Sequence, residues 1–227
     1  MAASRSAART TSDPRFWRDL PGAGVSANLA WERTRKYFHH LNKVTRVDNH
    51  GGMSDTIRPR KLAHIVLRTA RFEEVVQWWS TVLGAEPRHE SPFLTFLTYD
   101  DEHHRLAVLN IPHLADNDRM SAGLEHVAFT YDTLDDLLAT YLRLKHLGIT
   151  PVLPIHHGMT MSLYYADPDG TQCELQVDVM DEATAAAFMA SDVFAANPLG
   201  VPIDPDDLVL RRNAGESLDA LTEYVPI

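Results

Sequence analysis

The sequence has one cysteine and no long hydrophobic run among its 227 residues. A single thiol, Cys173, excludes an internal disulfide and a thiolate cage, so any metal must be held by nitrogen and oxygen ligands. No apolar stretch approaches the roughly 18 to 20 residues that span a bilayer, and the N-terminus lacks the apolar core of a secretory signal. We therefore expect a globular, cytoplasmic protein with no membrane partner.

Positive charge is scarce over most of the chain. The formal net charge is -10, yet residues 1–52 hold nine Lys and Arg against four Asp and Glu. Residues 53–227 hold twelve Lys and Arg against twenty-seven Asp and Glu. Because nucleic-acid-binding surfaces concentrate Lys and Arg on one face, this acidic body argues against a nucleic-acid partner.

Residues 1–52 show neither a sustained helical nor a sustained strand periodicity. They begin with an Ala/Ser/Arg-rich stretch and end near Gly51-Gly52, a flexible junction ahead of Met53, which is a candidate original start. We interpret residues 1–60 as an N-terminal extension. A natural arm, a targeting peptide and non-native upstream sequence all remain open, although Asp13 and Asp19 weaken the targeting interpretation.

The rest of the chain holds an internal repeat. In each copy an apolar strand precedes an amphipathic helix, a Gly-x-x-Pro stop and a hairpin. His64 and His126 are 62 residues apart, and the helix-ending Gly84 and Gly148 are 64 apart. Two nearly equal offsets indicate duplication. The expected helices cover 72–83 and 134–147, and the hairpin strands cover 93–99, 105–111, 161–166 and 171–177.

These patterns predict an α+β fold made of two tandem βαβββ modules that form a curved sheet around a metal centre. Module 1 covers residues 61–115 and module 2 covers 122–178, within one domain over 61–178. Residues 179–227 form a helical tail, with a helix expected at 181–190, a loop at 197–207 and a last short helix. Because such a tail more often packs or dimerises than catalyses, we expect a homo-oligomer.

His64, His126 and Glu174 form a candidate set of metal ligands. In a strand alternate residues share a face, so Glu174 lies with Gln172 and Gln176, opposite an apolar face. Aligning the two hairpins places Ala107, which cannot ligate, at the position of Glu174 in the first copy. Two histidines and one carboxylate leave about three octahedral positions open, an arrangement suited to non-haem Fe(II), with Mn(II) also accepted.

Three further motifs surround this set. His103-His104 lies at a hairpin turn, Tyr164 begins the segment Tyr-Tyr-Ala-Asp-Pro-Asp-Gly-Thr-Gln-Cys-Glu that ends at Glu174, and His156-His157 precedes that tyrosine. With the repeat, these motifs make residues 61–178 similar to the vicinal oxygen chelate superfamily of glyoxalases, bleomycin resistance proteins and extradiol dioxygenases. They resemble most the type I extradiol ring-cleaving enzymes, in particular the small single-domain biphenyl-2,3-diol dioxygenases.

The resemblance implies roles for these residues. His64, His126 and Glu174 would hold Fe(II), and a catechol and O2 would be the substrates. His104 would assist proton transfer and stabilise superoxide, while Tyr164 and His157 would orient or deprotonate substrate hydroxyls. The loop before Tyr164 is about two residues shorter than is usual in the family, so His156 competes with His157 for that role. The resemblance favours His157.

Two other functions remain open at this point. A metal-dependent isomerase, epimerase or thiol transferase of the same superfamily uses similar ligands but does not need His104 and Tyr164. A ligand-sequestering binding protein commonly lacks the ligand triad. The structural alternative for His103 and His104 is a solvated hairpin tip. Phe93, Phe96 and the segment Met159-Thr-Met161 are either pocket or core residues.

Overall fold

Module 1 forms a four-stranded mixed sheet covered by one helix. The computed structural model describes residues 57–226, so the predicted extension lies outside the described residues except for 57–60. The strand order is β1-β4-β3-β2, with β1 parallel to β4. The elements are β1 (Ile65–Thr69), α3 (Phe72–Leu83), β2 (Glu86–Glu90), β3 (Leu94–Thr98) and β4 (Leu106–Asn110).

Module 2 repeats this order and adds one short strand. Its sheet has the order β5-β8-β7-β6-β9, with β5 parallel to β8. The elements are β5 (His126–Tyr131), α4 (Leu134–His146), β6 (Leu153–His156), β7 (Thr160–Ala166), β8 (Gln172–Asp178) and β9 (Val201–Pro202). The predicted α+β fold with two βαβββ modules is confirmed, and β1 and β5 are edge strands of their own sheets.

The helices begin and end where local sequence chemistry requires it. In α3 the residues Val75, Trp79 and Val82 recur at helical spacing and are buried, and the helix ends at Gly84 with φ 62°. Glycine adopts this left-handed conformation without a Cβ penalty. The side chain of Thr133 caps α4 by accepting a hydrogen bond from the Asp136 amide at 3.1 Å.

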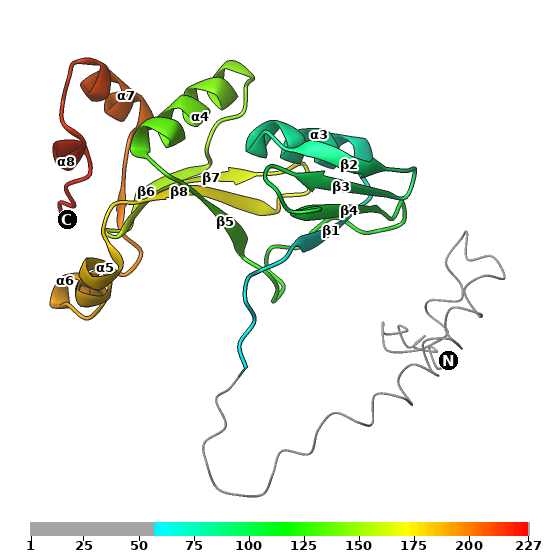
Figure 1. The fold of residues 1–227 in the computed structure, drawn as a ribbon, viewed down its shortest axis with the longest axis horizontal. Helices are drawn as coiled ribbons and strands as arrows, with labels where there is room; N and C mark the ends of the chain where they lie inside the picture. Colours follow the sequence, from blue (N-terminus) through cyan, green and yellow to red (C-terminus); the bar gives the residue numbers. More distant parts are fainter. Residues whose placement is uncertain (1–56, 227) are drawn as a thin grey trace, which may run out of the picture. The chain divides into compact units, whose positions relative to one another are not determined.

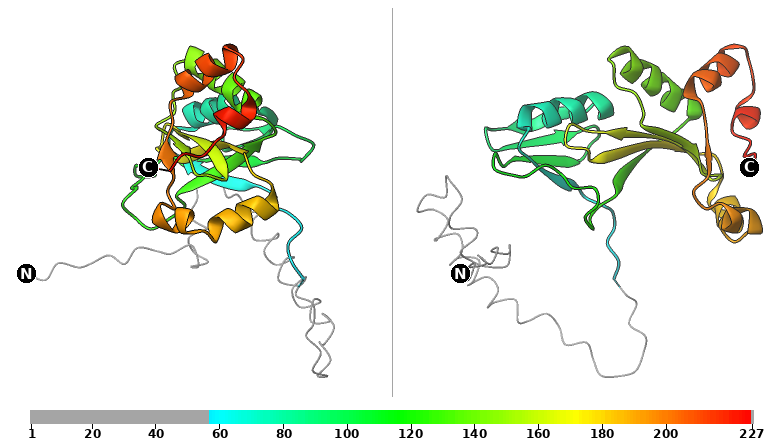
Figure 2. Two further views of the ribbon diagram at one scale, coloured as in Figure 1. Left: turned by 90° about the vertical axis from the view of Figure 1, so that its left-hand side faces the viewer. Right: turned by 180° about the vertical axis from the view of Figure 1, so that it is seen from behind.

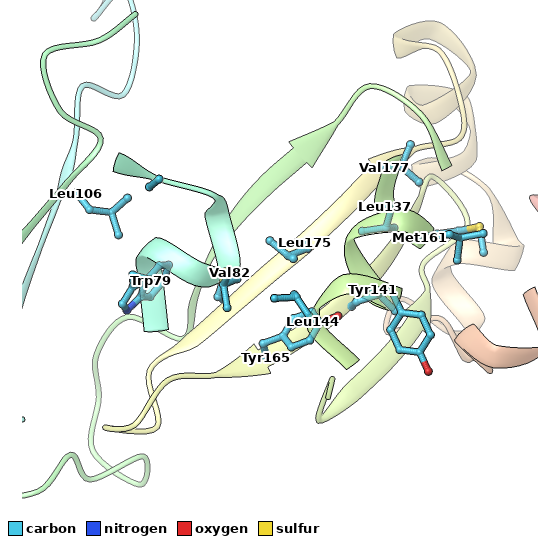
Figure 3. Packing of buried hydrophobic residues seen from close by; sticks show 14 of the residues in the cluster. Trp79, Val82, Leu106, Leu137, Tyr141, Leu144, Met161, Tyr165, Leu175 and Val177 are labelled. Carbon is cyan, nitrogen blue, oxygen red and sulfur yellow. The ribbon is translucent and has the colours of Figure 1, made fainter. Parts of the chain in front are cut away.

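One hydrophobic core lies under both helices. Figures 1 and 2 show α3 and α4 on the same side of the two sheets. Residues of both modules, including Trp79, Leu144 and Leu175, belong to one buried cluster (Figure 3). The Trp79 indole also donates to the Asp167 carboxylate at 3.0 Å, which ties α3 to the β7–β8 turn. The helix-facing side of each sheet is therefore core, and its other side is free to carry polar side chains.

The C-terminal tail packs on module 2. It holds α5 (Glu182–Met189), α6 (Asp192–Ala196), β9, α7 (Pro205–Asn213) and α8 (Leu218–Leu221). Of these, α6 and β9 were not predicted, and two helices rather than the one expected follow the predicted loop. β9 extends the sheet beside β6, and α7 contacts α4, where the Tyr141 hydroxyl donates to Asp206 at 2.8 Å. No helix within residues 57–226 is long and apolar enough to cross a bilayer.

Candidate metal centre and active site

The strand registers place the two modules in strict correspondence. Ala128, two residues after His126, is the neighbour of Glu174 on β8. Val66, two residues after His64, is the neighbour of Ala107 on β4. The prediction that Ala107 occupies the repeat position of Glu174 is confirmed, so only module 2 carries a carboxylate there.

His126 and Glu174 meet on the polar face of the module 2 sheet. His126 Nε2 lies 3.0 Å from Glu174 Oε2, and the Glu174 side chain is only 6% exposed. The alternate β8 residues Cys173, Leu175 and Val177 point into the core beneath the helices, which leaves Glu174 on the opposite face. No Lys or Arg in residues 57–226 pairs with this buried carboxylate. A buried anion with a histidine nitrogen beside it suits a bound cation.

Tyr164 and His157 lie next to these two residues. The His157 Nε2 atom and the Tyr164 hydroxyl are 3.1 Å apart, and the Tyr164 ring packs edge-on against His126 with centroids 5.3 Å apart. Tyr164 faces Glu174 across the β7–β8 ladder. We call His126, Glu174, Tyr164 and His157 the His126 half-site.

Burial and the nearby Glu174 carboxylate shift the pKa values of both Tyr164 and His157. Burial, reinforced by the negative charge of Glu174, raises the pKa of the Tyr164 phenol. Burial lowers the pKa of His157, an effect opposed by Glu174 and by the Leu199 backbone carbonyl. At neutral pH the phenol therefore stays protonated, and its hydroxyl can donate a hydrogen bond to Nε2 of a neutral His157, whose other nitrogen faces Leu199.

The neighbouring His156 has a different environment. It is buried, its Nδ1 accepts a hydrogen bond from the Gly158 amide at 3.0 Å, and its Nε2 lies 3.0 Å from the Thr222 carbonyl in the tail. Of the two candidate histidines, His157 is therefore the one that faces Tyr164. No pattern in the sequence indicated that the tail reaches these two histidines, where the Leu199 carbonyl contacts His157 and the Thr222 carbonyl contacts His156.

Gly200 is the point where the tail makes its closest approach to this turn. It has a positive φ of 84°, and a Cβ there would clash with the His156 backbone carbonyl. We expect Gly200→Ala to displace the tail, to lower the free energy of unfolding by more than about 1–2 kcal/mol, and to reduce turnover because His157 moves.

Gly215→Ala is the matched control for this prediction. Gly215 has a similar φ of 89° but open space around the Cβ position, so its substitution should cost only the backbone strain and leave turnover unchanged. Thermal unfolding and steady-state assays of both variants measure the two effects. Equal losses in both variants would show that the contact between the tail and His156 has no role.

A second cluster of site residues lies on the polar face of module 1. His104 stacks on Phe96 with centroids 4.3 Å apart and an interplanar angle of 12°, and its ring also lies 4.3 Å from that of His64. Its Nδ1 is 2.6 Å from Nδ1 of His103. Burial, with His64 and His103 nearby, lowers the pKa of His104. By contrast, the His103 side chain is 69% exposed. We call His64, His104 and Phe96 the His64 half-site.

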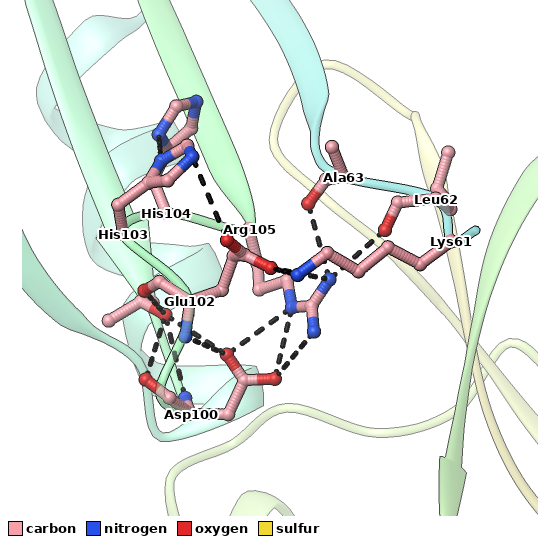
Figure 4. Close-up of polar contacts among 9 residues, drawn as sticks. Lys61, Leu62, Ala63, Asp100, Glu102, His103, His104 and Arg105 are labelled. Carbon is pink, nitrogen blue, oxygen red and sulfur yellow. Dashed lines mark hydrogen bonds and ion pairs between the residues drawn. The ribbon is translucent and has the colours of Figure 1, made fainter. Parts of the chain in front are cut away.

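The β3–β4 turn anchors the segment before β1 that carries His64. Arg105 donates to the Leu62 and Ala63 carbonyls at 3.0 and 3.2 Å and pairs with Asp100 at 2.9 Å (Figure 4). Lys61 also pairs with Glu102. The arginine that follows the paired histidines therefore holds the backbone beside His64, a function that no pattern in the sequence signalled.

The two half-sites do not come together within one chain. Residues 57–226 contain no group of three His, Cys, Asp or Glu side chains that could share a metal ion. Among the other candidates, Met161 is in the core and Phe93 is exposed. Tyr165 points away from Tyr164 into the core, as expected, and its buried hydroxyl has no hydrogen-bond partner in the described part of the chain.

Comparison with known proteins gives a family match and close relatives. Residues 61–175 match the model of the Glyoxalase/Bleomycin resistance protein/Dioxygenase superfamily. Biphenyl-2,3-diol 1,2-dioxygenase 2 of Rhodococcus globerulus is 46% identical over 72% of this chain and 87% of that protein. Biphenyl-2,3-diol 1,2-dioxygenase 3 of the same organism is 41% identical over 74% of this chain and 89% of that protein.

Solved structures are more distant. A glyoxalase/dioxygenase from Nostoc punctiforme aligns with a TM-score of 0.47 at 19% identity, over 57% of this chain and all of that one. Lactoylglutathione lyase from Agrobacterium tumefaciens aligns with a TM-score of 0.44, also at 19% identity, over 52% of this chain and 94% of that one.

Proposed function

We propose that this chain, which belongs to the Glyoxalase/Bleomycin resistance protein/Dioxygenase superfamily, uses Fe(II) and O2 to open the ring of a catechol beside its two hydroxyl groups. Both oxygen atoms enter the product, a semialdehyde, so no external reductant is needed. The observation that carries the proposal is the buried Glu174–His126 contact beside the Tyr164–His157 pair. The identity to two dioxygenases that act on biphenyl-2,3-diol supports an aryl catechol as substrate.

The residues present fit a divalent metal. Glu174 and His126 supply an oxygen and a nitrogen ligand at adjacent positions, and His64 is the third proposed ligand. Two histidines and one carboxylate suit Fe(II) and also accept Mn(II). A bound Fe(II) would supply Lewis-acid stabilisation of the ionised diol and a common centre for diol and O2.

The Tyr164–His157 pair provides a route for the substrate proton. Because the Tyr164 hydroxyl donates to the neutral His157, it can accept a proton from a catechol hydroxyl while passing its own proton to Nε2. The resulting imidazolium is stabilised by Glu174, which already opposes the lowering of the His157 pKa. This pair therefore orients the diol and removes one proton without exposing the site to bulk water.

His104 is the proposed acid on the oxygen side of the reaction. Its stacking between Phe96 and His64 holds the imidazole on the sheet face, and burial lowers its pKa. A neutral imidazole held against an aromatic ring can donate a hydrogen bond to reduced oxygen and exchange a proton with it.

Ring cleavage is tested by mixing anaerobically Fe(II)-loaded protein with catechol, alkyl catechols and biphenyl-2,3-diol, and then admitting air. We expect a yellow ring-opened product and O2 consumption equal to the catechol consumed. Mixtures that stay colourless with every catechol would contradict the proposal. Turnover of a thiol adduct with Mn(II), Ni(II) or Zn(II) and no O2 uptake would instead identify an isomerase or transferase of the same superfamily.

A further inference from the structure

We infer that two exposed leucines, Leu153 and Leu199, receive the substituent of the catechol and so select which catechols bind. This inference rests on the proposed function, because it takes the Tyr164–His157 pair as the group that binds a substrate hydroxyl. Leu153 is 44% exposed and Leu199 is 75% exposed. Each leucine is the neighbour of one member of that pair.

The strand registers place Leu153 next to Tyr164. Leu153 pairs with Tyr164 across β6 and β7, and Tyr164 pairs with Glu174 across β7 and β8. Because directly paired residues point to the same face of a sheet, all three side chains lie on the face that α4 leaves uncovered. Neighbouring strands are about 4.8 Å apart, so Leu153 lies one strand spacing from Tyr164 and two from Glu174. It is therefore on the far side of Tyr164 from the proposed metal ligands.

The uncovered face of module 2 becomes apolar at β6. Ile155, the other β6 residue on this face, pairs with Ser162 and is half-buried. Within the described residues, β9 pairs with Ile155 and His156 but does not reach Leu153, so the sheet edge is open there. Strands β5 to β8 contain no Lys or Arg, so a negatively charged substituent would have no counter-charge on them. Apart from Glu174 and Tyr164, the residues that β7 and β8 present on this face are polar or small: Thr160, Ser162, Ala166, Gln172, Gln176 and Asp178.

The tail brings Leu199 to the same pair. Figures 1 and 2 show α5 and α6 on the side of the sheet opposite α4, and Leu199 follows α6 in the chain. The backbone carbonyl of Leu199 is a hydrogen-bond partner of His157. The Asn197 side chain closes this turn by donating to the Gly200 carbonyl at 2.7 Å. The turn therefore holds an exposed leucine beside His157 before any substrate binds.

Phe188 fixes the tail against the strand turn that carries His157. In α5 it lies so close to Gly158 that a Cβ added to this glycine would meet the Phe188 ring. The same ring packs edge-on against Phe194 in α6 and against Tyr224, with centroids 5.7 and 5.5 Å apart. Covering an apolar side chain on an already fixed backbone gives binding free energy without the cost of ordering a loop.

The position of the substituent on the ring decides whether it reaches the leucines. In biphenyl-2,3-diol the phenyl group is on the carbon next to a hydroxyl-bearing carbon. When Tyr164 holds that hydroxyl and both oxygen atoms face Glu174, the phenyl group extends past Tyr164 toward Leu153 and Leu199. In the isomer biphenyl-3,4-diol the phenyl group is one carbon farther from the diol and does not follow this direction. The leucines therefore select an uncharged, apolar substituent beside the diol.

Asparagine substitutions of the leucines test this selection. Asparagine is similar in size to leucine but polar, and the contact of Leu199 with His157 uses the backbone, which Leu199→Asn keeps. In Leu153→Asn and Leu199→Asn, the ratio of kcat/KM for biphenyl-2,3-diol to kcat/KM for catechol should fall about 10-fold or more, mainly through KM. The ratio for biphenyl-3,4-diol should change far less. Leu142→Asn is the matched control, because Leu142 is 45% exposed but lies on α4, and it should keep both ratios.

Binding is measured separately from turnover, by anaerobic titration of each Fe(II)-loaded protein with the same three diols. The Kd for biphenyl-2,3-diol should rise about 10-fold or more relative to that for catechol in both leucine variants. Thermal unfolding verifies that each variant is folded. If an asparagine variant unfolds, the matching alanine variant, which also removes apolar surface, provides the test.

The outcomes separate this inference from the proposed function. Wild-type protein that cleaves the diols, together with leucine variants whose ratios equal those of Leu142→Asn, would overturn the inference and leave the proposed function standing. Wild-type protein that binds the diols but consumes no O2 would contradict the proposed function. The Kd ratios of the leucine variants would then still decide whether Leu153 and Leu199 receive the substituent.

Discussion

Glu174→Gln is expected to remove the bound metal and all measurable ring cleavage while leaving the fold intact. Glu174 is the only carboxylate among the three proposed ligands, and its amide replacement is neutral and a poor ligand for Fe(II). Changes in residues that merely support a ligand commonly cost 10- to 100-fold in metal affinity. Losing the ligand itself should therefore cost more than about 100-fold, measured by metal titration and by turnover.

The stability of the same variant distinguishes a ligand from a structural carboxylate. Burying an ion is costly, and replacing a buried ion with a neutral group is often neutral or stabilising. Without added metal, Glu174→Gln should therefore unfold at a temperature equal to or above that of the wild type. Glu125→Gln is the matched control, because this glutamate precedes His126 but is exposed and pairs with Arg119.

The control variant, Glu125→Gln, should keep both the bound metal and the ring-cleaving activity. If Glu174→Gln retained stoichiometric metal, Glu174 would not be a ligand. If it unfolded at a markedly lower temperature in the absence of metal, the contact with His126 would be a structural ion pair instead.

His104→Phe should have the second largest effect, a loss of turnover with the metal retained. Phenylalanine can fill the space between Phe96 and His64, but it can neither donate nor accept a proton. General acid–base groups contribute about 100- to 10,000-fold to rate, so we expect kcat to fall within that range. Metal content, measured on the same sample, should match the wild type.

His103→Gln is the control for this second prediction. His103 is the adjacent residue and its side chain is exposed, but its Nδ1 lies 2.6 Å from that of His104. A glutamine keeps a hydrogen-bonding group there, so this substitution should lower kcat far less than His104→Phe does. Full activity in His104→Phe would show that His103 and His104 are solvent-exposed residues of the hairpin turn with no part in the reaction. Loss of metal together with activity would instead place His104 in the ligand set.

The regular elements were predictable because their apolar residues follow a clear period. The helix expected at 72–83 matches α3, and the one at 134–147 matches α4 to within one residue. By contrast, β2 has the sequence EPRHE and is exposed at every position, so it shows no alternation that would reveal a strand. β9 is only two residues long and exists because it pairs with β6, a contact that local sequence does not encode.

The site was predictable in its chemistry but not in its assembly. The repeat alone identified His64 and His126 as equivalent, and alternation along β8 placed Glu174 on the polar face. The separation of the half-sites depends on how the modules pack, through contacts such as Trp79 with Asp167 and Tyr99 with Phe129. These residues are far apart in sequence and follow no period, so the sequence predicted one centre within a chain.

The most direct test of ring cleavage is the fate of the two oxygen atoms of O2. Fe(II)-loaded protein is supplied with biphenyl-2,3-diol under ¹⁸O2. The carbonyl group of the product is reduced or trapped, and the mass of the product is measured by mass spectrometry. The proposal predicts a ring-opened acid that contains both labelled atoms, allowing for exchange of the aldehyde or ketone oxygen with water. A quinone, or a ring-opened product with no label from O2, would contradict it.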